Sequence, residues 1–424
     1  MRHGKEMDKK LMKIRLLLRG LVFAAAIMIV SVLFASCSKP GFPYGSSEHG
    51  GSGIPGVNGY PTVAQQLAYW QQNAYSGGSF VVVARADEVL YYTKTIHYLN
   101  RPNVTITIRS YDNTRRILSL NGNKTMFLVQ GLNTLILENI LLQGHGSNYH
   151  SLVVVNQGSE LVMKDNSVIR GNRGRGVFVN GGVFTMKDNA SITANLSEGV
   201  QAHMGMLVVS RVYMYDNAQI YNNVGGMSAV DSILTMRNYA EIHSNRQNGG
   251  VTLSGVNARL FMHDEASISN NVFYGVRGAG GVFAQNNARI YMYEDASISD
   301  NFSNSVQGGG GVTLFGAASL NMHGDDIKIG RNMSFRSPGG GVWMNSGTLN
   351  ISGGRIYGND FLGSVNGNNN SAFPNNHHAL HITGSGIART VTYDGSGNFS
   401  APGANMLSTD GSIIVWGNGS NVIW

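Results

Sequence analysis

Residues 258–271 read Ala-Arg-Leu-Phe-Met-His-Asp-Glu-Ala-Ser-Ile-Ser-Asn-Asn, and residues 288–301 read Ala-Arg-Ile-Tyr-Met-Tyr-Glu-Asp-Ala-Ser-Ile-Ser-Asp-Asn. The same phrase recurs along the middle of the chain at intervals of 22 to 30 residues. Its methionines are Met163, Met186, Met214, Met236, Met262, Met292 and Met322, and Ile351 takes the eighth position. A period of this length indicates a solenoid in which each repeat forms one coil.

Each repeat divides into three short strands separated by turns. One strand follows a run of glycines (residues 251–253), a second ends on the methionine (residues 260–262), and a third is centred on an isoleucine (Ile268). Apolar residues alternate with mixed residues inside each strand, so one face of each strand is expected to point inward. A single coil buries too little apolar surface to stand alone, and the coils must therefore stack.

An asparagine follows each methionine by eight to ten residues. These residues are Asn172, Asn195, Asn223, Asn245, Asn271, Asn301, Asn332 and Asn359. An asparagine buried at the same turn of successive coils can satisfy the backbone groups of the turns around it. The column resembles the asparagine ladder of right-handed parallel β-helices in the pectate-lyase-like superfamily, over roughly residues 80–400. The resemblance implies an all-β, right-handed parallel β-helix. It does not imply one activity, because that superfamily contains lyases, hydrolases and non-enzymatic adhesins.

The ends of the chain differ in composition from the repeats. A basic stretch leads into the apolar run Leu21 to Phe34 and then Ala35-Ser36-Cys37, which resembles a lipoprotein signal with Cys37 as the lipidated residue. An uncut membrane-spanning anchor is the alternative. We expect a signal over 1–36, a tether over 37–60, an N-terminal cap over 61–79 that includes a helix at 62–73, the β-helix over 80–400, and a C-terminal cap over 401–424. The anchor implies the outer membrane or cell surface.

Charge and cysteine content restrict the partners. Residues 1–36 hold seven of the 31 basic and two of the 24 acidic residues, so 24 basic and 22 acidic residues remain. That balance predicts no nucleic-acid partner. The single cysteine leaves no disulfide and no thiolate metal site.

Two columns of polar residues follow the methionines. The first is Lys164, Lys187, Tyr215, Arg237, His263, Tyr293 and His323, and the second is Asp165, Asp188, Asp216, Asn238, Asp264 and Glu294. Stacked acids could bind Ca²⁺ along a groove. A column that recurs in every repeat is more simply explained by turn capping, in which each acid accepts backbone N–H groups. Ca²⁺ is thus the one cofactor the sequence leaves open, and no other metal is predicted.

Two fragments are similar to elements of polygalacturonases. Gly144-His145-Gly146 matches one of them, and the pair Asp325-Asp326 resembles the aspartates of another. Their order along the chain is reversed, which favours coincidence. If the protein is a polysaccharide lyase or glycoside hydrolase, the coil that also contains Lys328 and Arg331 is where a site is expected.

The segments between the ladder asparagine and the next strand lengthen toward the C-terminus, over residues 272–281, 302–311, 333–341 and about 360–379. Such loops usually carry the function of a repeat protein. They supply aromatic and arginine side chains for a carbohydrate or protein ligand, with outward Phe283 and Trp343 beside them. The predicted ligand-binding residues are Phe273, Tyr274, Arg277, Phe302, Phe335, Arg336 and Trp343.

The pairing of Ile-x-x-Asn with Gly-Gly-Val is also loosely similar to the repeats of polymorphic outer-membrane adhesins. The sequence therefore favours a non-enzymatic lipoprotein that binds a host or envelope ligand. A polysaccharide-cleaving enzyme and a structural spacer remain the alternatives.

Overall fold

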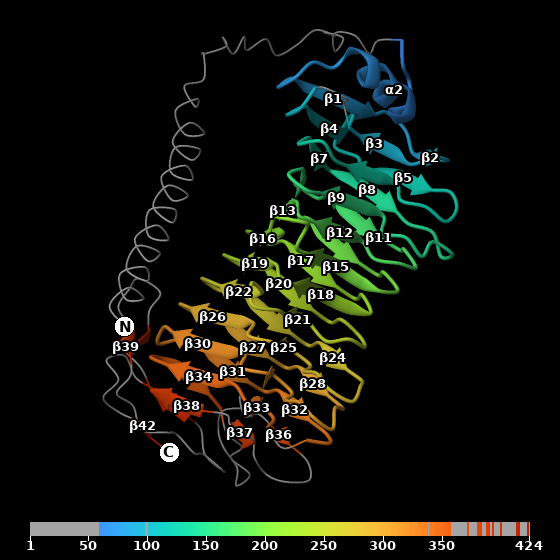
Figure 1. The fold of residues 1–424 in the computed structure, drawn as a ribbon. Coiled ribbons are helices and arrows are strands. Elements are labelled where there is room, and N and C mark those ends of the chain that lie inside the picture. Colours follow the sequence, from blue (N-terminus) through green and yellow to red (C-terminus); the bar gives the residue numbers. More distant parts are fainter. Residues whose placement is uncertain are drawn as a thin grey trace, which may run out of the picture. The chain divides into compact units, whose positions relative to one another are not determined.

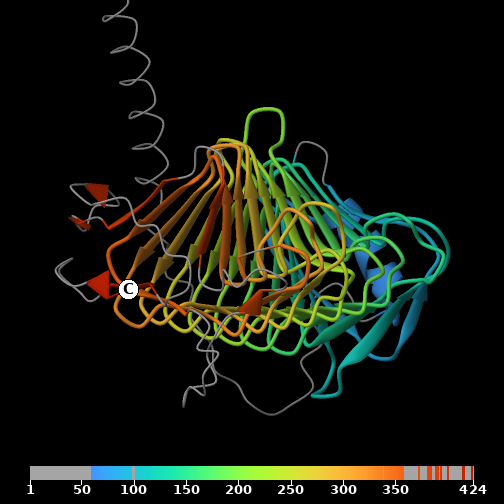
Figure 2. The same ribbon diagram turned by 90° about the horizontal axis from the view of Figure 1, so that it is seen from below.

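The structure is a computed structural model that describes residues 59–97, 101–337 and 339–357, together with the strand residues 371–372, 380–383, 387–390, 392–393, 399–400, 413–415 and 422–423. Its repeats form a right-handed parallel β-helix, so the predicted fold is confirmed. Successive coils are stacked in register along the solenoid (Figure 1). Seen along the stack, each coil encloses the same narrow core (Figure 2).

Three long parallel sheets make the walls of the solenoid. Sheet A contains β1 (Ser79–Ala84), β4 (Thr105–Ser110), β7 (Thr134–Glu138), β10 (Glu160–Lys164), β13 (Val183–Met186), β16 (Arg211–Met214), β19 (Ile233–Met236), β22 (Arg259–Met262), β26 (Arg289–Tyr293), β30 (Ser319–His323), β34 (Thr348–Ile351) and β38 (Ile387–Thr390). Sheet B contains β2 (Glu88–Leu90), β5 (Arg116–Leu120), β8 (Ile140–Gln143), β11 (Val168–Arg170), β14 (Ser191–Thr193), β17 (Gln219–Tyr221), β20 (Glu241–His243), β23 (Ser267–Ser269), β27 (Ser297–Ser299), β31 (Lys328–Gly330) and β35 (Gly354–Ile356), followed by the antiparallel β41 (Ile413–Val415) and β42 (Val422–Ile423).

Sheet C contains β3 (Lys94–Ile96), β6 (Phe127–Val129), β9 (Val153–Asn156), β12 (Val177–Asn180), β15 (Glu198–His203), β18 (Gly225–Val230), β21 (Val251–Ser254), β25 (Val282–Gln285), β29 (Val312–Phe315), β33 (Val342–Asn345) and β37 (Leu380–Thr383). A short sheet D is formed within the long C-terminal loops by β24 (Val272–Phe273), β28 (Phe302–Ser303), β32 (Met333–Ser334) and β36 (Ser371–Ala372). A separate pair joins β39 (Thr392–Tyr393) to β40 (Phe399–Ser400).

The core is a set of columns, one for each inward position of the coil. The repeat methionines pair with one another across sheet A, as in Met262 opposite Met292, and all seven are fully buried. Ile268 and Ile298 are paired in the same way across sheet B. Equivalent side chains therefore stack at the strand spacing of about 4.8 Å. Each side chain of a column is buried between its equivalents in the coils above and below.

The asparagine column forms a hydrogen-bonded ladder at the turn from sheet B to sheet C. The backbone N–H of Asn223 donates to Oδ1 of Asn245 (3.1 Å), and the backbone N–H of Asn245 donates to Oδ1 of Asn271 (3.1 Å). The same arrangement runs from Asn172 through Asn332, and all of these side chains are buried. Asn148, which the repeat phrase does not include, extends the ladder by donating to Oδ1 of Asn172 (2.8 Å).

The residue before most ladder asparagines has a left-handed backbone. Its φ is 55° at Ala194, 54° at Ser244 and 54° at Arg331. This conformation is disfavoured for residues with a Cβ. It is held because the buried side chain that follows bonds to the backbone of adjacent coils, so the ladder fixes the bend at which the chain enters sheet C.

Helix α2 (Val63–Asn73) covers the first coil. Thr62 caps it in a reciprocal arrangement with Gln65, and the Glu88 carboxylate accepts the N–H groups of Val63 (2.7 Å) and Ala64 (3.1 Å). The buried Gln66 side chain bonds both the N–H and the C=O of Val83 in β1. The helix therefore satisfies polar backbone at the open end and hides that edge from water.

Glycines form a stack of their own where the long loops return to sheet C. The N–H of Gly281 donates to the C=O of Gly310 (3.1 Å), and the N–H of Gly311 donates to that of Gly340 (3.0 Å). A Cβ on Gly311 would lie 2.6 Å from the carbonyl oxygen of Gly341. The glycines are needed because adjacent loops approach backbone to backbone.

Candidate functional site

The long C-terminal loops fold back onto sheet C. The loops cover the outer face of this sheet, so Phe283 and Trp343, which point away from the solenoid core as predicted, are only 8% and 5% exposed. Trp343 stacks against Phe315 (ring centroids 6.5 Å apart), and the Arg277 guanidinium lies 4.1 Å above the Phe315 ring. Arg277 also donates two hydrogen bonds to Oε1 of Gln307 (both 3.1 Å). Trp343 is therefore part of the packing beneath the loops.

The other predicted loop residues fall into two groups. Phe273 packs against Gly275 and Gly278 of its own loop and is half-buried. Tyr274, Phe335 and Arg336 are exposed, and the half-buried Phe302 lies 6.1 Å from Tyr274.

Apolar side chains of these loops are also exposed on and beside sheet D. The members of this patch, called the sheet D patch, are Tyr274 (54% exposed), Val276 (72%), Val306 (49%), Met333 (39%) and Phe335 (45%). The patch joins three loops, and Arg277 beside it is held by Phe315 and Gln307.

The acidic column forms turn caps at the corner between sheets A and B. Asp188 accepts the N–H of Asp165 (3.0 Å), Asp264 accepts the N–H of Asn238 (3.0 Å), and Glu294 accepts the N–H of Asp264 (3.1 Å). Each residue of this column has a left-handed backbone (φ 49–58°), which Asp and Asn tolerate better than most residues. The capping interpretation of the column thus has direct hydrogen-bond support.

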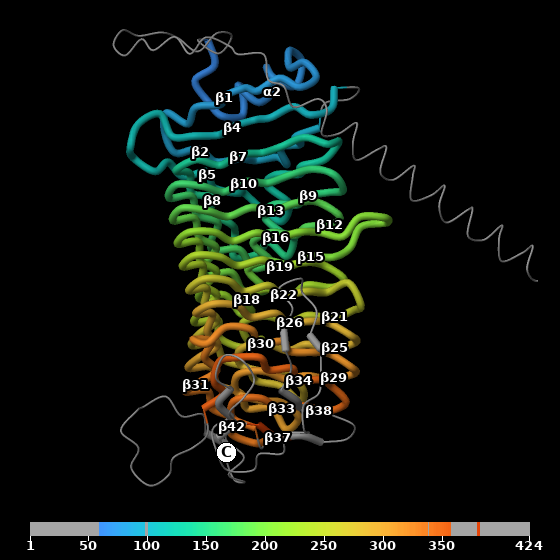
Figure 3. Tube along the Cα trace, turned by 90° about the vertical axis from the view of Figure 1, so that its left-hand side faces the viewer, coloured from blue at the N-terminus to red at the C-terminus, as the bar shows by residue number. Residues whose placement is uncertain are grey.

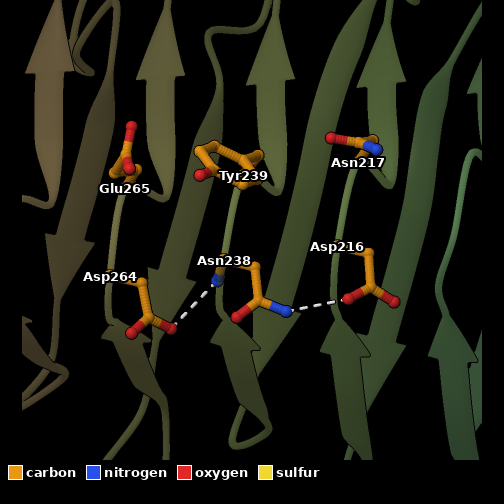
Figure 4. Close-up of a pocket in the computed structure, with 6 residues that line it drawn as sticks. All are labelled: Asp216, Asn217, Asn238, Tyr239, Asp264 and Glu265. Atoms are coloured by element: carbon orange, nitrogen blue, oxygen red, sulfur yellow. Dashed lines mark hydrogen bonds between the residues drawn. The ribbon is translucent and has the colours of Figure 1, made fainter.

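A shallow depression of about 450 Å³ lies over this corner (Figure 4). It is lined by Asp216, Asn217, Asn238, Tyr239, Asp264 and Glu265. Asn238 bridges it, because its side-chain amide donates to Asp216 (2.8 Å) while its backbone donates to Asp264. Within the part of the chain that the structure describes, no group of three or more His, Cys, Asp or Glu residues could hold a metal ion.

The residues considered for polysaccharide cleavage do not converge. Asp325 and Asp326 are exposed at the corner between sheets A and B, while His145 lies in a turn of a distant coil and bonds Ser147 (2.8 Å). Arg331 holds Asp300 through two hydrogen bonds (2.6 and 2.5 Å), and this arginine is the first cause of the lowered pKa of Asp300. Lys328 is exposed on sheet B. These groups do not make a paired-carboxylate site.

The outer face of sheet A between β16 and β26, strands that Figure 3 labels, presents a set of arginine and aromatic residues of which the sequence columns contained only Tyr215 and Arg237. Arginine and aromatic side chains alternate there with the buried apolar column. The set, called the arginine–tyrosine face, contains Arg211, Tyr213, Tyr215, Arg237, Arg259, Phe261, Arg289 and Tyr291. All are exposed or half-buried. Four strands at about 4.8 Å spacing place the arginines along roughly 14 Å of the solenoid.

The aromatic rings of this face pack on one another. Phe261 and Tyr291 are register partners on β22 and β26, with ring centroids 5.0 Å apart and planes 10° from parallel. Tyr213 and Tyr215 stack along β16 at 6.0 Å. Such cross-strand pairs stabilise a sheet. They also hold the rings upright, so ring edges and the tyrosine hydroxyls face outward rather than flat ring surfaces.

The arginines of this face keep their charge unpaired. Within the described residues, no ion pair engages the guanidinium groups of Arg211, Arg237, Arg259 or Arg289. The basic side chain of an earlier coil behaves differently, because Lys164 pairs with Glu138 at 2.7 Å.

Histidine adds little charge beside the arginines. Burial, followed by the nearby positive charge of Arg237, lowers the pKa of His263, which lies in the adjoining coil. This histidine is therefore mostly neutral near pH 7, and the permanent cations of the face are arginines.

A sequence signal for this face exists but lies before the methionine rather than after it. Arg211, Arg259 and Arg289 all stand three residues before a repeat methionine, and an aromatic residue stands one before it. The columns considered from sequence start after the methionine, so they include only Tyr215 and Arg237.

Several predicted residues lie outside the described residues. They include Cys37 and Asn359. Among the helices that the structure describes, none is long and apolar enough to cross a membrane.

Comparisons of the chain with protein-family models, with curated proteins and with solved structures give no match.

Proposed function

We propose that this protein is a non-enzymatic cell-envelope lipoprotein, and that its β-helix binds an extended acidic polysaccharide along the arginine–tyrosine face. The lipid anchor is Cys37, and the location is the outer membrane or cell surface. The ligand class is a linear chain bearing carboxylate or sulfate groups at regular intervals.

The proposal rests mainly on the pairing of Arg259 with Arg289, which lie opposite each other in adjacent strands. Like charges directly opposite each other destabilise a sheet. Local rules of this kind are broken mainly at functional sites. A carboxylate or sulfate between the two guanidinium groups would remove the repulsion, and it would accept the paired N–H donors that arginine offers in a fork.

The shape of the face supports a polymer over a small molecule. Arginines begin β16, β22 and β26 at the same register position, Arg237 directly follows β19, and the surface is open along the stack. A repeating ligand can follow such a surface and gain affinity from several weak contacts at once. The upright tyrosines supply hydroxyl groups between the arginines, suited to sugar hydroxyls.

The same repetition argues for binding rather than cleavage. A hydrolase or lyase needs one coil in which an acid or base departs from the pattern. Here the arginine–aromatic arrangement is shared by several coils, and the candidate carboxylates Asp325 and Asp326 lie at a corner away from it.

The test is binding of the full chain to polygalacturonate, alginate and hyaluronate, with dextran as the neutral polymer. We expect binding to acidic polymers that weakens with salt. The variant Arg259→Gln/Arg289→Gln should weaken it by at least roughly tenfold, since each charged contact contributes more than about 0.7 kcal/mol.

The matched control is Arg170→Gln/Lys328→Gln, which removes two exposed charges from sheet B. If both double variants bind equally weakly, net charge rather than this face is responsible, and the proposal fails. Equal affinity for single-stranded DNA would likewise reduce the ligand class to any polyanion. Release of reducing ends from any polymer, with or without Ca²⁺, would contradict the non-enzymatic assignment.

The anchor has a separate test. Metabolic labelling with a lipid probe should modify the wild type and spare Cys37→Ser, and the wild type should fractionate with membranes. An unlabelled wild type would remove the lipoprotein part of the proposal and leave the binding part untouched.

The sheet D patch carries a second candidate function, the binding of a protein ligand. Exposed apolar residues gathered on one surface of a soluble body often mark such sites. Tyr274→Ser should then abolish capture of a host or envelope protein while leaving polysaccharide binding unchanged. A variant that retained both activities would rule out this patch.

A further inference from the structure

From the β6–β7 turn to the β33–β34 turn, the corner between sheets C and A is a tight turn of two to four residues in every coil but one. The connection from β15 to β16 runs over seven residues, 204–210, and projects beyond its neighbours (Figure 3, yellow-green loop beside β15). The N–H of Gly205 donates to the C=O of Val208 (2.9 Å), so Met206 and Leu207 form the tip of a small hairpin. Their side chains are 90% and 87% exposed.

The base of this hairpin is built into the solenoid. The buried Ser210 hydroxyl donates to the C=O of His203 and accepts the N–H of Gly181 (2.7 Å). A Cβ on Gly205 would lie 2.9 Å from the Cα of Gly181, so the two backbones are in close contact. The tip is therefore held out from the body at a fixed place, although exposure of two large apolar side chains to water is unfavourable.

Other apolar side chains are exposed at the same corner. Leu132 (51% exposed) and Val256 (58%) occupy the equivalent turn of other coils, and Met204 (40%) at the hairpin base contacts Asn257 beside Val256 (3.9 Å). Arg211, which directly follows the hairpin, is exposed. The one acidic group at the turn of the next coil, Asp231, accepts the N–H of Asn257 (2.9 Å).

We propose that this corner docks on a lipid bilayer, with Met206 and Leu207 inserted among the headgroups and upper acyl chains and Arg211 at the phosphate level. An apolar tip with a cation at its base suits an interface between water and lipid. A protein partner fits less well, because these convex side chains supply on the order of 400 Å² in total, whereas a stable interface buries about 1,200 Å² or more. A bilayer needs no complementary pocket. The proposal does not depend on lipidation at Cys37, and Arg211 is the one residue that it shares with the arginine–tyrosine face.

The test locates the hairpin rather than the chain, because the apolar run Leu21 to Phe34 could hold the full chain on vesicles by itself. In a Cys37→Ser background, Leu207→Cys is labelled with an environment-sensitive fluorophore. The matched control is Asn217→Cys, an exposed position at the corner between sheets A and B. The vesicles are phosphatidylcholine with phosphatidylglycerol, and nitroxide-bearing lipids serve as quenchers.

We expect the label at 207 to shift to the blue and to be quenched by shallow nitroxides, while the label at 217 does neither. Adding Met206→Gln should lower partitioning of the labelled protein into vesicles by roughly tenfold, because it removes most of the free energy gained by burying one apolar side chain. Arg211→Gln should weaken it only on vesicles that contain phosphatidylglycerol.

Three results would overturn the proposal. They are an unchanged 207 label on vesicle-bound protein, equal quenching of both labels, and a 207 label that responds to protein concentration without lipid. The last result would instead make the hairpin a contact between copies of the chain.

Discussion

Replacement of Asn245 by alanine should separate the ladder's contribution from that of the apolar core. The Asn245 side chain is fully buried and accepts the backbone N–H (3.1 Å) and the side-chain amide (3.3 Å) of Asn223. Its own amide donates to the C=O of Ile220 (3.2 Å) and to Oδ1 of Asn271 (2.8 Å). Alanine removes all four bonds but leaves the strands and the apolar columns unchanged.

The expected cost follows from which groups lose their last partner. The Asn223 amide keeps bonds to the C=O of Ile192 and Tyr221, and Asn271 still accepts the Asn245 N–H. The backbone N–H of Asn223 is left buried without an acceptor, which costs about 1–3 kcal/mol, and the three other bonds contribute about 0.5–1 kcal/mol each. Asn245→Ala should therefore lower the free energy of unfolding by roughly 2.5–6 kcal/mol.

Urea unfolding followed by far-ultraviolet circular dichroism measures this change as a lower midpoint at an unchanged slope. Asn217→Ala is the control, because Asn217 is exposed and its side chain makes a single bond to Asn189 (3.3 Å), so its cost should stay within about 0.5 kcal/mol. If Asn245→Ala were as mild as this control, the ladder would be a consequence of stacking and not a cause of stability. A changed slope would indicate that the coils no longer unfold together, which the ladder argument does not predict.

Three further changes test separate parts of the fold. Met262→Ala removes a fully buried side chain and should cost about 2–5 kcal/mol in the same urea assay; a smaller loss would mean that adjacent coils close the gap. Gly311→Ala should cost about 1–3 kcal/mol because its Cβ would press on the Gly341 carbonyl, and an unchanged midpoint would show that the loop stack can shift. The pKa of Asp300 is lowered, so its pair with Arg331 adds stability above its unfolded pKa of about 3.9, and that stability is lost as the pH falls through the folded pKa. Asp300→Asn should thus cost no more than about 1 kcal/mol near pH 7, since the pair is partly exposed, and progressively less as the pH falls below about 3.9; a deficit independent of pH would refute the linkage.

Much of the fold could be predicted because its signals are local and repeated. A methionine, an isoleucine and an asparagine at fixed spacing determine the strand faces and the turn within one coil, and the period then requires stacking. The helical spacing of residues 62–73 similarly predicts the capping helix, which the structure places at Val63–Asn73.

The candidate site was harder to predict, because it depends on contacts between coils. Trp343 has the same alternation as its outward neighbours in sheet C, and only the path of the folded loops buries it. Conversely, Arg259 and Arg289 are 30 residues apart in sequence, and the strand register places them side by side.

By itself, the sequence determined the three strands of each coil, the residues that face inward and the need for the coils to stack, because the apolar period and the turn residues act within one repeat. The tertiary structure decided which outward residues share a face, which loops cover a sheet and which hairpin projects. Those outcomes depend on the register between coils and on how glycine-rich backbones pack, and neither is encoded in the spacing of a single repeat.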